Sequence, residues 1–90
     1  MEVSCQFAVY PLGVSSLEPW VSAALEAVRR AGLEPRPGAM STLVVGPAEA
    51  VFRALAGAFD AVAAAGCVMT ATVSNACPAG WAESSGKGGD

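Results

Sequence analysis

Apolar residues are interleaved with small polar ones in three stretches of the chain, residues 3–10, 40–45 and 69–75. Such alternation is typical of β-strands that have one covered face and one open face. The polar positions carry hydroxyl and carboxamide groups, and none of them is charged. A face that meets only water usually includes Lys and Glu, so this pattern predicts a partly dry surface that makes directed hydrogen bonds.

Two further stretches have the apolar period of an α-helix. We expect the first to begin after Ser16 as its N-cap and to end with Gly32 as its C-cap. The second is expected to open at Gly46-Pro47 and to stop at Gly66. The residues expected to face the sheet are Val21, Ala24, Leu25 and Val28 in the first helix and Phe52, Leu55, Phe59 and Val62 in the second.

These elements define a fold class. Strands are expected at about residues 2–10, 40–45 and 67–74, and the segment 33–38 holds two prolines and a glycine, so any strand there lies at a sheet edge. With right-handed crossovers, the order β-α-β-β-α-β predicts a four-stranded antiparallel sheet with both helices on one face, the ferredoxin-like plait of the α+β class. The strand order would be 4-1-3-2. We expect one such domain over residues 1–78 and a flexible C-terminal tail over 79–90.

The composition bears on partners. Of the 90 residues, 53% are hydrophobic and only 14% are charged, against about 25% charged in an average soluble domain. We therefore expect more apolar surface than one monomer hides, and a homo-oligomer. The net charge of −3 argues against a nucleic-acid partner, which depends on clustered Lys and Arg. The RNA-binding version of this plait also needs several aromatic residues on its central strands, where only Tyr10 is a candidate.

No membrane partner is expected, because the apolar stretch 61–73 is interrupted by Gly66 and is shorter than the roughly 20 residues that span a bilayer. The first ten residues lack the basic start and apolar block of a secretion signal, so we expect a cytoplasmic protein.

The chain has few of the residue types that catalysis requires. It contains no histidine, and its three cysteines, Cys5, Cys67 and Cys77, form no CxxC pair. No close pair of carboxylates stands in the strands, and no group would activate a nucleophile. We therefore expect no catalytic residue, no metal site and no cofactor, and a role in binding rather than in catalysis.

Three short motifs carry a resemblance to a known family: Tyr10-Pro11-Leu12-Gly13, Gly38-Ala39-Met40-Ser41-Thr42 and Val73-Ser74-Asn75-Ala76-Cys77-Pro78. In this order and spacing the chain resembles the thiamine-binding, YkoF-like family of small ferredoxin-like proteins. The resemblance implies non-catalytic binding of thiamine, or of its hydroxymethylpyrimidine part, by a homo-oligomer, a dimer or a dimer of dimers. The expected ligand-binding residues are Ser41, Thr42, Ser74 and Asn75, which match the motifs, with Gln6 and Tyr10 nearby by strand order.

The chemistry of the ligand agrees with these residue types. An aminopyrimidine offers an exocyclic amino donor and ring-nitrogen acceptors, which hydroxyls and amides match, and a flat face that Tyr10 or Met40 could cover. Glu49 and Asp60 are candidate partners for the cationic thiazolium of thiamine, although solvated helix positions are the safer interpretation of both. The alternative function is an oligomerising structural or interaction module without a small-molecule ligand, whose polar sheet face serves only as an interface.

Overall fold

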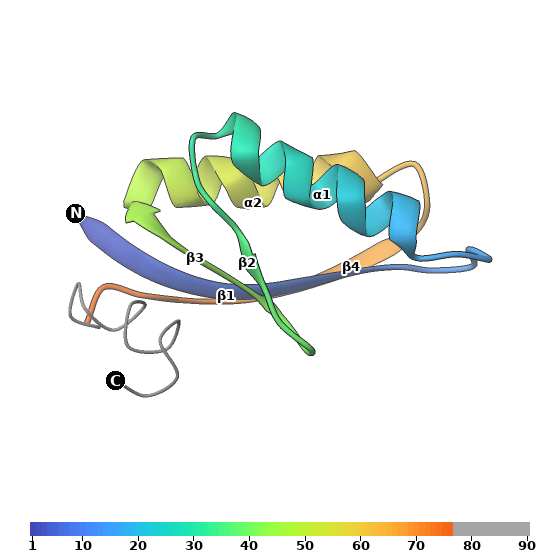
Figure 1. Ribbon diagram of the computed structural model, residues 1–90, viewed down its shortest axis with the longest axis horizontal. Coiled ribbons are helices and arrows are strands. Elements are labelled where there is room, and N and C mark those ends of the chain that lie inside the picture. The colour runs from blue at the N-terminus through green and yellow to red at the C-terminus, as the bar shows by residue number, and fades with distance from the viewer. Residues whose placement is uncertain (77–90) are drawn as a thin grey trace.

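The computed structural model describes residues 1–76 of the chain (Figure 1). Within these residues the strands are β1 (Glu2–Pro11), β2 (Arg36–Pro37), β3 (Thr42–Pro47) and β4 (Cys67–Ser74). The helices are α1 (Glu18–Arg30) and α2 (Ala48–Val62). The expectations for Cys77 and for a flexible tail over 79–90 lie outside the described residues.

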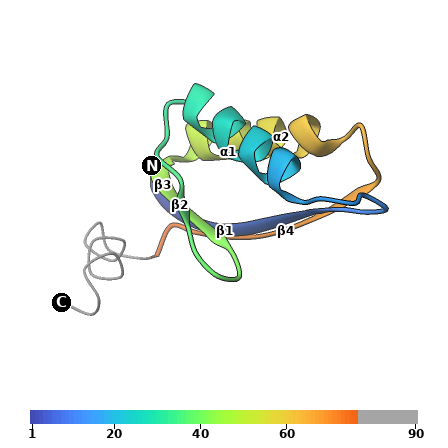
Figure 2. The same cartoon turned by 45° about the vertical axis from the view of Figure 1, so that its right-hand side comes forward.

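The strands form one antiparallel sheet in the order β2-β3-β1-β4, and both helices cover the same face of it (Figure 2). This is the expected strand order, so the ferredoxin-like α+β plait is confirmed. The pairing register places Cys5 opposite Val44 and Val73, and Phe7 opposite Thr42 and Ala71. Directly opposite residues point to the same face of a sheet, so the odd-numbered positions of β1 and the residues opposite them face the helices.

Helix α1 begins one residue later than expected. Its N-cap is Leu17, which makes no side-chain capping hydrogen bond, so the prediction of Ser16 was wrong by one position. Pro19 lies in the first turn, where an amide has no intrahelical partner. At the other end the cap is Ala31, and Gly32 follows with φ +88°, a left-handed conformation that favours glycine.

Helix α2 is rotated relative to the expectation. Leu55 and Val62 are buried as expected, but Phe52 and Phe59 are 56% and 43% exposed, so their predicted place in the core was wrong. The buried positions of α2 include the small residues Ala50, Ala54 and Ala58. α2 also touches α1 at Gly57, where an added Cβ would lie 3.5 Å from the Cβ of Ala27, an ordinary contact distance. The buried residues of α2, which pack against the sheet and α1, are Ala50, Val51, Ala54, Leu55, Ala58 and Val62.

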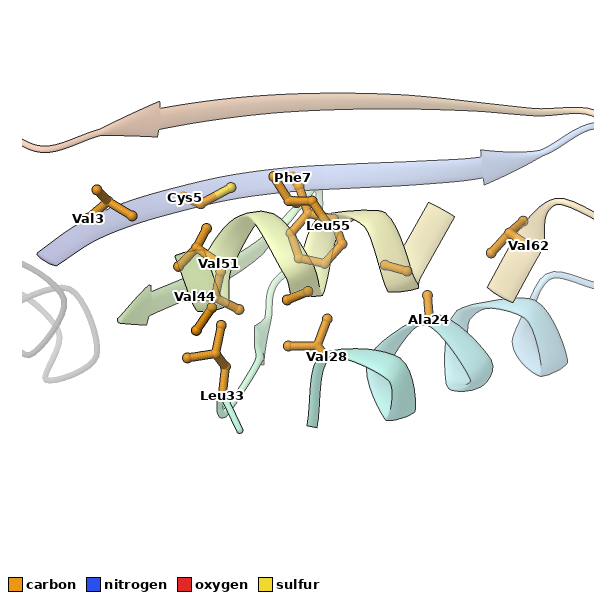
Figure 3. Packing of buried hydrophobic residues seen from close by; sticks show 13 residues of the cluster. Val3, Cys5, Phe7, Ala24, Val28, Leu33, Val44, Val51, Leu55 and Val62 are labelled. Carbon is orange, nitrogen blue, oxygen red and sulfur yellow. The ribbon is translucent and has the colours of Figure 1, made fainter. Parts of the chain in front are cut away.

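The core lies between the sheet and the helices. Figure 3 shows Val3, Cys5 and Phe7 of β1 pointing toward α2, where Val51 and Leu55 meet them. Burial raises the pKa of the Cys5 thiol above its ordinary value, because the thiolate would lose its hydration there. Cys5 is therefore a small apolar core residue, as expected for a reduced thiol in a strand.

Neither helix of residues 1–76 has the length and apolar character needed to cross a membrane.

Candidate ligand-binding site

A hollow of about 200 Å³ opens on the helix-covered side of the sheet, between the end of β1, the first half of α1 and the β2–β3 hairpin. The hairpin bends away from the helix layer (Figure 2), which leaves space beneath α1. Three segments of the chain therefore share the lining. They are residues 7–11 of β1, Leu17, Val21, Ala24 and Leu25 at α1, and residues 37–42 of the hairpin.

The lining is neutral and mostly apolar. None of its residues is charged, and three of them, Tyr10, Ser41 and Thr42, carry a hydroxyl group. Within residues 1–76 none of these three hydroxyls takes part in a hydrogen bond, and none is buried away from solvent. A ligand can therefore bond to them without displacing an intramolecular partner from that part of the chain.

Several apolar side chains at the hollow are exposed to solvent. Leu17 is 56% exposed, Val21 is 41% exposed and Met40, near the hairpin tip, is 83% exposed. Covering apolar surface contributes about 25 cal/mol for each Å² removed from water. A flat apolar ring in the hollow would gain this contribution from both the helix side and the hairpin side.

The hairpin sequence explains how the hydroxyls reach the hollow. The amide of Gly38 donates a hydrogen bond to the carbonyl oxygen of Ser41 at 2.8 Å, which closes a tight turn. A Cβ on Gly38 would lie 3.2 Å from that same oxygen, so the turn fits glycine better than a larger residue. Thr42 then enters β3 opposite Phe7 and Pro37, on the helix-facing side.

The structure therefore divides the six expected site residues into two groups. Tyr10, Ser41 and Thr42 line the hollow, whereas Gln6 lies on the open face of the sheet. Tyr10 is an even-numbered position of β1 like Gln6, but it borders the hollow at the end of β1, beyond the last residue that pairs with β3. Ser74 pairs with Ser4, near the opposite end of β1. Six residues of strand separate Ser4 from Tyr10, or about 20 Å.

Two side chains of the second group make local hydrogen bonds. The Nδ2 of Asn75 donates a hydrogen bond to the Sδ of Met1 at 3.2 Å, and the Oγ of Ser74 accepts one from the amide of Ala76 at 3.0 Å. The candidate carboxylates Glu49 and Asp60 are on α2, and neither lines the hollow.

The sequence interpretation missed the helical part of the site. The helical pattern predicts that Val21 and Leu25 belong to the apolar face that packs on the sheet, and it predicts no role for Leu17. A signal was present in that two large apolar residues, Leu17 and Val21, lie four positions apart at the start of a helix. It could not be separated from ordinary core packing without knowing that the adjacent hairpin bends away.

No group of three or more His, Cys, Asp or Glu side chains in residues 1–76 lies close enough to hold a metal ion.

The architecture defines a small plait with a neutral hollow beside its first helix. Residues 5–75 match the model of the thiamine-binding protein family, and the chain belongs to that family. The resemblance seen in the sequence motifs is confirmed. No curated protein matches the chain.

Solved structures with the same fold come from bacteria and an archaeon. A hypothetical protein from Methanocaldococcus jannaschii has a TM-score of 0.80 and 19% identity, over 99% of this chain and 98% of that one. A proposed thiamine biosynthesis/salvage protein from Thermotoga maritima has a TM-score of 0.74 and 20% identity, over 94% and 98%. A domain of unknown function from Bacillus cereus has a TM-score of 0.71 and 23% identity, over 82% and 75%. At these identities the likeness shows the shared fold.

Proposed function

We propose that this chain binds the hydroxymethylpyrimidine part of thiamine in the hollow beside α1, without catalysing a reaction. The observation that carries the proposal is the lining itself: a neutral, mostly apolar surface to which Tyr10, Ser41 and Thr42 contribute, and the hydroxyls of these three residues are unpartnered within residues 1–76. Membership of the thiamine-binding family supports the ligand class. Of the expected site residues, the proposal assigns ligand contact to these three.

The size and charge of the hollow favour the pyrimidine ring over the whole vitamin. Ligand pockets for larger molecules usually enclose about 300–1,000 Å³, and this hollow encloses about 200 Å³. A single ring suits that volume better than two. The cationic thiazolium finds no carboxylate in the described lining, so in bound thiamine it would lie at the mouth of the hollow, in contact with water.

Selectivity would follow from the hydrogen-bond pattern. A hydroxyl both donates and accepts, so Ser41 and Thr42 can meet either the exocyclic amino group or a ring nitrogen. A matched bond contributes about 0.5–1.5 kcal/mol, whereas a buried group left without a partner costs about 1–3 kcal/mol. Ligands with the wrong pattern would therefore be rejected more strongly than the right ligand is favoured.

The proposed mode of action is binding alone. Among the described residues, no group at the hollow is a base or an activated nucleophile, since the hydroxyls of Ser41 and Thr42 have no partner there that could take a proton. Assembly into a homo-oligomer is part of the proposal and is supported by the low share of charged residues and by the exposed aromatic residues of α2.

Thermal unfolding with three compounds tests the ligand assignment. The compounds are hydroxymethylpyrimidine, thiamine and the isolated thiazole alcohol. A ligand at 100 times its Kd stabilises the folded state by about 2.7 kcal/mol, which raises the Tm of a domain of this size by roughly 10–20 °C. We expect the first two compounds to raise the Tm and the thiazole to leave it unchanged. A rise with the thiazole alone, or with none of the three, would contradict the proposal.

A further inference from the structure

A groove of about 300 Å³ lies between α1 and α2, where the helix layer is open to solvent. Its floor is formed by residues with small side chains or none, so the two helices come into contact along it. At the closest point, a Cβ added to Gly57 would lie 3.5 Å from the Cβ of Ala27. We call this surface the interhelical groove, and its floor consists of Ala27, Ala31, Gly57 and Ala61.

The walls of the groove carry three charged residues, Arg30 of α1 and Arg53 and Asp60 of α2, all exposed. The two helices run in opposite directions (Figure 1). From the contact between Ala27 and Gly57, Arg30 lies toward the end of α1 and Arg53 toward the start of α2, so both arginines lie at the same end of the groove. Asp60 is about 10 Å further along α2 than Arg53. The groove therefore has a basic end and an acidic end.

Neither arginine has a partner in the part of the chain that the structure describes, residues 1–76. Glu26 and Glu49 each precede one of them by four positions on the same helix, but within that range neither forms an ion pair with it, and neither lines the groove. An exposed helical pair of this spacing is weak, so an anionic ligand can compete with it.

Both arginines can act on one ligand group. The axes of packed helices lie about 8–10 Å apart, so two long side chains from opposite walls can reach a group placed between them. Two cations that face the same space repel each other, and a bound anion removes this repulsion. The basic end of the groove is therefore complementary to a compact anion with more than one charge.

We propose that the interhelical groove is a second binding site, which holds a small phosphate monoester with its phosphate between Arg30 and Arg53 and an amino group beside Asp60. Planar guanidinium groups donate paired hydrogen bonds to phosphate oxygens. A phosphate monoester carries about −1.5 to −2 charges at pH 7, which matches the two arginines. A carboxylate or a phosphodiester carries a single negative charge and would leave one arginine unmatched.

Asp60 determines the other end of the ligand. Its carboxylate disfavours a second anionic group and accepts hydrogen bonds from an ammonium group. Side chains of a helix lean toward the N-terminus of that helix, so Arg30 and Asp60, on antiparallel helices, lean toward each other. Only alanine and glycine form the floor between them, which leaves room for a short aliphatic chain that joins the two charged ends.

This inference goes beyond the proposed function and does not depend on it. The hollow lies between α1, the end of β1 and the hairpin, and no described residue lines both the hollow and the groove. Binding of hydroxymethylpyrimidine and binding of a phosphate ester can therefore succeed or fail separately.

Calorimetric titration of the full chain with three probes tests the chemistry of the site. The probes are propyl phosphate, 3-aminopropyl phosphate and diethyl phosphate. Because the groove is open to water, we expect a Kd on the order of 1 mM for propyl phosphate. The amino compound should bind about 2- to 5-fold more tightly, since it also meets Asp60. Diethyl phosphate, a diester with one charge, should bind about 5-fold more weakly or worse.

Four variants test the residues. Arg30→Gln and Arg53→Gln should each weaken the binding of propyl phosphate about 5-fold or more. Arg29→Gln is the matched control, because Arg29 has the same charge in the last turn of α1 but does not line the groove, and we expect wild-type affinity. Asp60→Asn should bind propyl phosphate at least as tightly as the wild type and lose the preference for the amino compound. All four positions are exposed, so circular dichroism should stay unchanged.

A wild-type chain that bound neither monoester at about 10 mM would overturn the proposal. Equal weakening by Arg29→Gln and Arg53→Gln would also overturn it, because the anion would then respond to net charge and not to a site. Equal affinity for the diester would assign the groove to a phosphodiester, such as a lipid headgroup, and the monoester would be wrong. A preference for the amino compound that persisted in Asp60→Asn would contradict the placement of the amino group.

Discussion

Leu55 and Phe59 lie one helical turn apart on α2 and provide a sharp test of how this helix is oriented. The sequence pattern places both in the core, whereas the structure leaves Leu55 9% exposed and Phe59 43% exposed. Replacing a buried Leu by Ala costs about 2–5 kcal/mol, because transfer energy is lost and a cavity remains. We expect Leu55→Ala to lower the free energy of unfolding by an amount in this range.

The expected effect of Phe59→Ala is smaller, although more atoms are removed. A fully buried Phe costs about 3–5 kcal/mol on truncation to Ala, and little more than half of this ring is covered. Next to solvent no closed cavity remains, and Ala is a better helix former than Phe by about 0.5 kcal/mol. We therefore expect a loss of about 1 kcal/mol, which is smaller than the loss for Leu55→Ala by roughly 1 kcal/mol or more.

Urea unfolding followed by circular dichroism measures both values. The measurement should be repeated over a range of protein concentrations, because burial of Phe59 in an oligomer would make its stability depend on concentration. Equal m-values in the two variants would show that the comparison reflects the folded state. If Phe59→Ala proved as costly as Leu55→Ala at every protein concentration, Phe59 would be a core residue and the rotation of α2 that exposes it would be refuted.

Two other predictions concern the core. A Cβ on Gly46 would lie 2.6 Å from the Cδ2 of the buried Leu33, so Gly46→Ala should lower the free energy of unfolding by about 1–3 kcal/mol in urea titration; an unchanged midpoint would show that Leu33 moves without cost. The pKa of Cys5 is raised above its ordinary value of 9.0 by burial, so folding favours the neutral thiol. Its contribution to stability is complete below about pH 9 and is lost as the pH rises through the folded-state pKa. The stability of the wild-type chain should therefore fall more steeply above about pH 9 than that of Cys5→Ala, and parallel curves would contradict the assignment.

Much of the fold could be predicted because local signals agreed with the global topology. β4 runs from Cys67 to Ser74, as expected, although α2 ends at Val62 with Ala63 as its C-cap and so stops four residues before the expected Gly66. β3 runs from Thr42 to Pro47 and so lies two residues later than expected, because its limits depend on the pairing with β1 and not on its own apolar pattern. The strand order followed from the handedness of the two crossovers.

The orientation of α2 and the composition of the site could not be predicted in the same way. Hydrophobicity alone favours burial of Phe52 and Phe59, but the orientation of α2 depends on how it packs against both the sheet and α1, and the structure buries Ala50, Ala54 and Ala58 instead. Likewise, neighbouring strand residues such as Ser41 and Thr42 should point to opposite faces. They share one hollow because the hairpin bends there, and such a bend depends on tertiary geometry.

Calorimetric titration with hydroxymethylpyrimidine most directly tests the claim that this ligand binds in the hollow. The same Thr→Val substitution is made at the hollow and away from it. Thr42→Val removes a hydroxyl at the hollow with little change in volume, and Thr72→Val makes the same change on the open sheet face. The account predicts binding by the wild-type chain, an affinity weakened by about 1–3 kcal/mol, or roughly 5- to 150-fold, in Thr42→Val, and wild-type affinity in Thr72→Val and in Asn75→Ala. Wild-type affinity in Thr42→Val together with a loss in Asn75→Ala or Thr72→Val would move the site away from the hollow and contradict the account.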